Sequence, residues 1–258
     1  MPYLLNSLRL FATDAGREAY LEDEDYSELV VAMIEVIVTT ATEKQYKDTL
    51  NAEMQSSLVD ICLNLMVITR AEAESIREDA EEYINLTLDC CDKQTSRTVK
   101  SQACKLLEAI CDNVFGAITY ITNFCCSAIN LALQGDAGRV YDTEVIEGTK
   151  TSVFLTRTDK IFIADTCLLA LTCMSYVIPQ RVDLVKMFEE TISGNVGTFL
   201  TRHPIAGSEV DVLEAAKTVI LRSRFGLLLG YYADMLFNNK PEAFQQTLNF
   251  LLESIGQI

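Results

Sequence analysis

The fold is decided by residues 96–133, which read SRTVKSQACKLLEAICDNVFGAITYITNFCCSAINLAL. Apolar residues recur at helical spacing in two runs, on either side of a short joint at Asn113–Gly116. The second run also carries Tyr120, Phe124 and Leu131, which lie off its main apolar stripe. A helix that is apolar on more than one side must be buried on more than one side, so one antiparallel partner cannot cover it. The stretch therefore predicts a helical hairpin packed between similar hairpins, which is how α-solenoids are built.

The rest of the chain continues this order of helix, short turn, helix and longer connector. β-Branched residues are frequent in Ser27–Thr40, which makes a strand the alternative there, but the length of the apolar pattern favours a buried helix. The interval 134–158 has three glycines and little periodicity, and we expect a long loop or insertion. Further helices are expected at Pro2–Phe11, Lys44–Leu50, Glu53–Ile68, Asp159–Ile178, Arg181–Leu200, Val210–Phe237 and Ala243–Ile255.

The repeat distance of these hairpins, roughly 40–60 residues, fits HEAT repeats better than shorter helical repeats. We therefore predict an all-α protein in which residues 1–258 form a single HEAT-type α-solenoid, a right-handed superhelix of antiparallel helical hairpins. Pro179 is expected to stop one helix, and Pro241 fits the first turn of the last helix. Gly194 and Gly197 fall inside a helical pattern and are interpreted as a kink or a close-packing site.

The formal net charge of −16 argues against a nucleic-acid-binding groove, which needs a basic stripe. Acidic residues concentrate in two runs, Glu22–Asp25 and Glu72–Glu82. Each run is either a well-solvated face or a surface for basic partners. Neither run has the carboxylate order of a calcium-binding EF-hand loop. The candidate partner-binding acids are Glu22, Asp23, Glu24, Asp25, Glu78, Asp79, Glu81 and Glu82.

Nine cysteines and one histidine restrict the chemistry that the sequence suggests. The cysteines show no CxxC spacing and none lies near His203 in sequence, so a zinc site is not expected. Most of them fall on predicted apolar helix faces, which indicates buried free thiols in a reducing compartment. The sequence has neither a Walker loop nor a GxGxxG motif. We therefore expect no enzyme activity, no cofactor and no metal site.

The sequence does not predict a membrane protein or a secreted one. The longest apolar candidate for a membrane span, Ile161–Ile178, is interrupted by Asp165 and by several threonines and serines. The N-terminus lacks the basic start and long apolar run of a signal peptide. The expected location is therefore the cytoplasm and the nucleus.

Two patterns follow each other within residues 77–133. The first is an acidic segment of the form E-x-x-E-E-Y-I, and the second is a helix of the form R-x-V-K-x-x-A-x-x-L-L-x-x-I-C. Together they resemble the middle region of the importin-β (karyopherin-β) nuclear transport receptors, and most of all the branch with the importin-α export receptor and the large importins. Asp159–Ser175 and Val219–Leu236 resemble later helices of that branch. The residues of the two patterns are Glu78, Glu81, Glu82, Tyr83, Ile84, Arg97, Val99, Lys100, Ala103, Leu106, Leu107, Ile110 and Cys111.

The resemblance implies a receptor that binds cargo or the GTPase Ran on the inner surface, which is formed by the second helix of each hairpin. It also implies that nucleoporin phenylalanine-glycine repeats bind between outer helices, and that Ran-GTP controls cargo binding through the curvature of the solenoid. Such receptors are several times longer, so this chain would be an internal fragment. On the central hairpin, the polar candidates for the inner surface are Thr119, Asn123, Ser127 and Asn130.

Two alternatives stay open. The interval 134–158 is either a plain flexible insertion or a partner-binding insert, whose basic end would be Lys150, Arg157 and Lys160. The whole chain could instead be a HEAT-repeat scaffold subunit of a multiprotein assembly without a transport role. Binding of phenylalanine-glycine repeat peptides distinguishes the two functions, because a scaffold would not bind them.

Overall fold

The structure is a computed structural model that describes residues 2–13, 15–17, 19, 23–43, 52–68, 72, 97–134, 159–202 and 212–255. Within these ranges every regular element is a helix, which confirms the all-α prediction for the described part of the chain. The expected helix Lys44–Leu50 and residues 135–158 of the expected loop lie outside it. The helices are α1 (Pro2–Phe11), α3 (Glu24–Thr42), α4 (Ala52–Met66), α7 (Val99–Asn113), α8 (Ala117–Gln134), α10 (Lys160–Cys173), η3 (Ile178–Gln180), α11 (Leu184–Lys186), η4 (Met187–Gly197), α12 (Thr198–Arg202), α13 (Val212–Asn239) and α14 (Pro241–Ile255).

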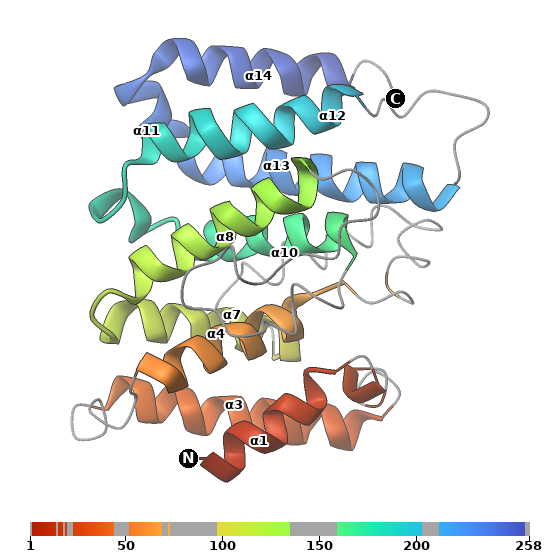
Figure 1. Ribbon diagram of the computed structural model, residues 1–258, viewed down its shortest axis with the longest axis vertical. Coiled ribbons are helices and arrows are strands. Elements are labelled where there is room, and N and C mark those ends of the chain that lie inside the picture. Colours follow the sequence, from red (N-terminus) through yellow and green to blue (C-terminus); the bar gives the residue numbers. More distant parts are fainter. Residues whose placement is uncertain are drawn as a thin grey trace.

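The helices are stacked in two rows along the long axis of the molecule, with α1 and α3 at one end and α14 at the other (Figure 1). One row contains α3, α7, α10 and α13, and the other contains α1, α4, α8, the segment η4–α12, and α14. Between the rows, α4 packs on α7, α8 packs on α10, and α14 packs on α13. The main apolar cluster draws residues from nearly every helix, so the core runs along the stack between the two rows.

The central hairpin has the joint that the sequence predicted. Thr98 caps α7, because its hydroxyl oxygen accepts a hydrogen bond of 3.2 Å from the backbone N–H of Ser101. The helix ends at Asn113, and α8 begins at Ala117. Between them Gly116 has φ +79°, a left-handed conformation that glycine adopts at low cost. The following helix, α8, packs on α10, η4 and α7, which meets the expectation that one partner cannot cover it.

Helix α10 is enclosed by its neighbours, and its end differs from the prediction. Every residue from Ile163 to Cys173 is buried. The sequence placed the end of this helix at Ile178, before Pro179, but the helix ends at Cys173. The N–H of Ser175 bonds to the carbonyl of Thr172, and the N–H of Val177 bonds to that of Met174. These hydrogen bonds join residues three apart, whereas the bonds of an α-helix join residues four apart. The α-helix therefore ends before Pro179.

The partner segment of α10 is not the single α-helix that was expected over Arg181–Leu200. It begins as α11 at Leu184, continues as the π-helix η4, and ends as α12. A Cβ atom at Gly194 would lie 2.7 Å from the carbonyl oxygen of Glu189, so a larger residue would force a shift there. Of the two interpretations that the sequence left open, a kink or a close-packing site, the close contact with the backbone of η4 at Gly194 favours the second, whereas the space beside Gly197 is open. The last helix, α14, starts at Pro241, which confirms the expected place of this proline in a first turn.

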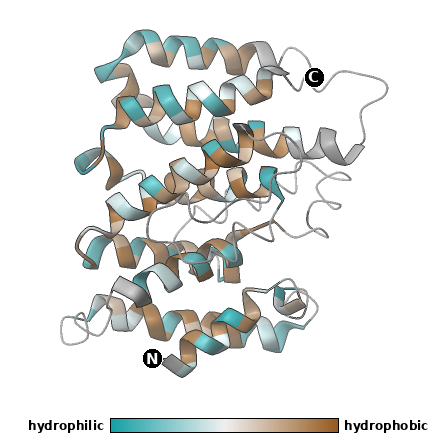
Figure 2. Ribbon diagram, in the orientation of Figure 1, coloured by the Kyte–Doolittle hydropathy of each residue, from teal (hydrophilic) through white to brown (hydrophobic). Residues whose placement is uncertain are grey.

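Figure 2 shows apolar and polar segments alternating along the helices, as expected where each helix buries one side. None of the helices in the described ranges is long and apolar enough to cross a membrane. The seven cysteines in these ranges are all free, and all except Cys126 are buried. The prediction of buried free thiols is thus confirmed for six of the seven, and Cys126 is free but only half-buried.

Candidate functional site

The first acidic run forms the start of α3. Asp23 is the N-cap residue, and its Oδ1 accepts a hydrogen bond of 2.9 Å from the backbone N–H of Asp25. Glu24 and Asp25 occupy the first turn, where negative charge interacts favourably with the helix dipole. All three side chains are exposed. Glu22 lies outside the described residues, so the structure places three of the four acids of this run.

The exposed side of α3 combines two kinds of side chain, and we call it the α3 face. At 100° per residue, Glu24, Glu28 and Glu35 fall along one edge of this side. Tyr26, Leu29 and Val36 fall along the other edge, and their exposed fractions are 48%, 48% and 55%. Leu29 belongs to the apolar pattern of Ser27–Thr40 from which a buried helix was predicted, but its own side chain is exposed. The helix buries the side that carries Val30, Val31, Ile34, Ile37 and Ala41.

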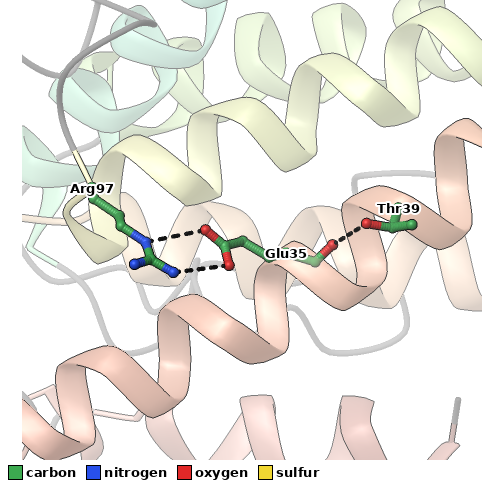
Figure 3. Close-up of polar contacts among 3 residues, drawn as sticks. All are labelled: Glu35, Thr39 and Arg97. Atoms are coloured by element: carbon green, nitrogen blue, oxygen red, sulfur yellow. Dashed lines mark hydrogen bonds and ion pairs between the residues drawn. The ribbon is translucent and has the colours of Figure 1, made fainter.

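Arg97, just before α7, binds the acidic edge of the α3 face (Figure 3). Its Nε and Nη2 atoms donate to the two carboxylate oxygens of Glu35, each at 3.2 Å. The hydrogen bond to Glu35 and the nearby charges of Glu35 and Glu28 raise the pKa of Arg97. In the same figure the hydroxyl of Thr39 donates to the backbone carbonyl of Glu35 at 2.9 Å. The acidic edge therefore already holds one guanidinium group of the chain itself.

One residue of the second acidic run is held in a similar way. Nζ of Lys100 donates to Oε1 of Glu72 at 3.0 Å, and both side chains are partly buried. Glu78, Asp79, Glu81 and Glu82, the four candidates named from this run, lie outside the described residues. Their proposed role stays a prediction.

The four polar candidates on α8 differ in how open they are. Thr119 and Asn123 are exposed, and Ser127 is half-buried. Asn130 is also half-buried, and its Oδ1 accepts a hydrogen bond of 2.6 Å from Nδ2 of Asn195 in η4. The first half of this stripe is thus open to a partner, while its last member connects α8 to the π-helix.

Of the three basic candidates at the end of the interval 134–158, the described part of the chain contains one. Lys160 is the first residue of α10 and is half-buried. Lys150 and Arg157 lie outside the described residues. The structure therefore brings Asp23, Glu24 and Asp25 together on one helix of one row, and places the α8 candidates in the other row.

The described cysteines are poor candidates for chemistry. Burial raises the pKa of Cys126 to about 12, and burial is also the largest cause that raises the pKa of Cys62 and Cys111. A hydrogen bond to Cys167, and then burial, raise the pKa of Cys125. A thiol in this state is neither a nucleophile nor a metal ligand at neutral pH. The parts of the chain that the structure describes contain no group of three or more histidine, cysteine, aspartate or glutamate residues that could hold a metal ion.

Comparison with known proteins gives no relative: no protein-family model, no curated protein and no solved structure matches this chain. The site must therefore be judged on its own geometry. Sequence reasoning found the acids at the start of α3 but missed Glu28, Leu29 and Val36. A signal was available, because Glu24, Glu28 and Glu35 follow helical spacing on one edge while Tyr26, Leu29 and Val36 follow it on another.

Proposed function

We propose that this protein recognises other proteins and that it does so as a HEAT-type helical-repeat protein. The support for the repeat architecture is the two-row stack, in which each helix uses its neighbours to bury its apolar side. The observation that carries the proposed function is the α3 face, which presents acidic and apolar side chains to solvent together. A protein with a net charge of −16 and such a face favours partners that are basic.

Within this class, we propose a nuclear transport receptor, or part of one, that acts in the cytoplasm and the nucleus. The support is the resemblance of residues 77–133 to importin-β receptors, which the stacked helices accommodate. Basic cargo, Ran and phenylalanine-glycine repeats are the proposed partners. The exposed residues Thr119 and Asn123 of α8 are the proposed contacts on the inner surface. A change in the curvature of the stack would couple Ran binding to cargo release.

The test is a set of three binding measurements on the purified full chain. Calorimetry would measure Ran loaded with a non-hydrolysable GTP analogue, Ran-GDP, and a peptide of phenylalanine-glycine repeats. A transport receptor binds the GTP form in preference to the GDP form and also binds the repeat peptide. Replacement of Thr119 and Asn123 by arginine should weaken one of these complexes, whereas the same change at the exposed Thr198 of α12 should not.

The scaffold alternative makes the opposite prediction for the same measurements. A HEAT scaffold without a transport role binds neither form of Ran nor the repeat peptide. That result would end the transport proposal and leave a protein-binding repeat protein. Equal binding of Ran-GTP and Ran-GDP would also contradict the transport proposal, because nucleotide control is the basis of directional transport.

A further inference from the structure

We propose that the α3 face docks a basic amphipathic helix of a partner protein, with the apolar seam of that helix on Tyr26, Leu29 and Val36 and its basic flank on Glu24 and Glu28. This proposal deepens the proposed function, on which it rests, by placing the basic partner on one helix. It is independent of the α8 candidates, which lie in the other row.

The apolar edge of the α3 face is long enough for a helix to lie along it. Tyr26 and Val36 are ten residues apart, which corresponds to about 15 Å along the helix axis. Leu29 lies between them, three residues after Tyr26 and seven before Val36, so at about 100° per residue the three fall on one side of α3, within about 80° of each other. The ring of Phe11 in α1 lies 6.3 Å from the ring of Tyr26 and extends this edge toward α1. Each of the three side chains is about half exposed, although the helix buries its opposite side against neighbours.

The acidic edge identifies the occupant by charge. Glu24, Asp25 and Glu28 are exposed, and Arg97 is bound to Glu35 on the same edge. That ion pair shows that the edge can hold a guanidinium group with both carboxylate oxygens. A partner helix with lysine or arginine beside an apolar seam would repeat this contact at Glu28 and Glu24, about two to three turns further toward the N-terminus of α3. Helices in grooves are recognised through such anchors at spacings of three, four and seven residues.

A second copy of this chain is a poor occupant for the same reason. A symmetric contact through the α3 face would bring two acidic edges together, in a chain whose net charge is −16. Like charges that face each other oppose association, whereas a basic helix gains attraction along the whole edge. The charge pattern therefore favours a different, basic protein over self-association.

The experiment uses the full chain and a defined probe. The probe is a fluorescein-labelled peptide of 18 residues, made of lysine, leucine and alanine in amphipathic helical order. A second peptide has the same composition in an order without a continuous apolar face. Fluorescence anisotropy should show that the amphipathic peptide binds at least about tenfold more tightly than the reordered one. Only the amphipathic peptide presents a continuous apolar seam beside a basic flank.

Two double variants test separately how the apolar edge and the acidic edge of the α3 face contribute to binding. Leu29→Ser with Val36→Ser should weaken binding of the amphipathic peptide about tenfold and leave its salt dependence unchanged. Glu24→Gln with Glu28→Gln should weaken it about five- to tenfold and make it less salt-dependent. The matched control is Glu190→Gln with Asp234→Gln, two exposed acids far along the chain, and it should stay within about twofold of the wild type.

Hydrogen exchange on the unaltered chain provides a test that does not depend on the variants folding. The amphipathic peptide should slow exchange at the backbone amides of residues 26–36 and leave those of α13 unchanged. Protection elsewhere, equal binding of both peptides, or equal loss in the control variant would overturn the proposal. So would self-association of the free chain that the serine variant removes, because a second copy would then cover this face. These outcomes leave the transport proposal intact, since that proposal fails only in the Ran and repeat-peptide measurements.

Discussion

Asp165 of α10 accepts a hydrogen bond of 2.9 Å from Nε of Arg224 of α13, and both side chains lie in the interior of the protein. Their exposed fractions are 0% and 2%, so this ion pair joins two neighbouring helices of one row away from water. A buried pair adds little stability compared with a well-packed apolar pair, because both charges lose their hydration. Removal of one partner is costly, because the remaining charge stays buried.

Arg224→Met should therefore lower the free energy of unfolding by about 3–5 kcal/mol. The reason is that the buried carboxylate of Asp165 loses the guanidinium group of Arg224, rather than the loss of packing, since methionine fills most of the space of the arginine stem. Urea denaturation followed by circular dichroism measures the change. The double variant Asp165→Leu with Arg224→Met should recover most of the loss, and Arg181→Met, at an exposed arginine, should have little effect. A loss below about 1 kcal/mol for Arg224→Met would contradict this account.

Two glycines should respond to alanine with opposite signs. Gly116→Ala should lower the free energy of unfolding by about 1–2 kcal/mol, because alanine must adopt φ +79° there although no atom blocks its Cβ. Gly230→Ala should raise it by about 0.5–1 kcal/mol, because Gly230 lies inside α13 with open space around its Cβ. Thermal or urea denaturation of the two variants measures both. A gain in stability for Gly116→Ala would contradict the strain expected at the α7–α8 joint, and a loss for Gly230→Ala would contradict the open space beside Gly230.

The thiols should make the protein less stable in alkali. A thiol whose pKa is raised by folding stabilises the native state below its ordinary pKa, and this contribution is lost as the pH rises toward the folded value. For Cys126 that window runs from about 9.0 to about 12. The free energy of unfolding, measured in urea at several pH values, should fall across it, and Cys126→Ala should fall less steeply than the wild type. Parallel curves for the two proteins would contradict the prediction.

The same burial predicts slow reaction with thiol reagents. In a Cys90→Ser, Cys91→Ser variant only the seven described cysteines remain, and six of them are buried. At pH 8 a colorimetric thiol reagent should modify these seven slowly in the native protein and completely in urea. Fast modification of more than one thiol in the native state would show that the core between the rows is open.

Arg97→Ala should change binding more than stability. Arg97 is 71% exposed and Glu35 is 43% exposed, and ion pairs in contact with water contribute little to stability. Its removal frees the carboxylate of Glu35 at the acidic edge of the α3 face. The affinity for the basic amphipathic peptide should therefore rise a few fold, in contrast to the losses expected from the other variants of this face. Unchanged or weaker binding of the labelled peptide would contradict the proposed orientation of the basic flank.

The features that the sequence predicted well depend on neighbouring residues. The joint at Asn113–Gly116, the short helix Pro2–Phe11 and the start of α14 at Pro241 all follow from local signals such as caps, glycine and proline. Ser27–Thr40 was correctly assigned to a helix despite its β-branched residues, because the length of its apolar pattern outweighed residue preference. The acids at the start of α3 also fit a local rule, since dense negative charge suits a helix N-terminus.

The features that were missed depend on contacts between distant residues. No local signal ends α10 at Cys173, where Cys111 of α7 contacts Met174 with their sulfur atoms 3.1 Å apart. The π-helix η4 is also supported from a distance, since Asn195 bonds to Asn130 in α8 and Ser193 bonds to Thr247 in α14. Helical spacing groups Leu29 with Val36 on one edge of α3, but it does not show that this edge is exposed. Hydropathy identifies apolar residues, but only the position of α7 and α1 decides which of them stay uncovered.

The enclosure of α10 has a consequence for how this protein can change over generations. A substitution anywhere between Ile163 and Cys173 alters a side chain that already touches its neighbours, so an acceptable change there needs a matching change in α8 or α13. The amino-acid sequence of α10 should therefore change slowly, and its changes should be accompanied by changes in α8 or α13. The solvent side of α3 meets no such restriction from packing, so any constancy found there in related chains would have to come from a ligand.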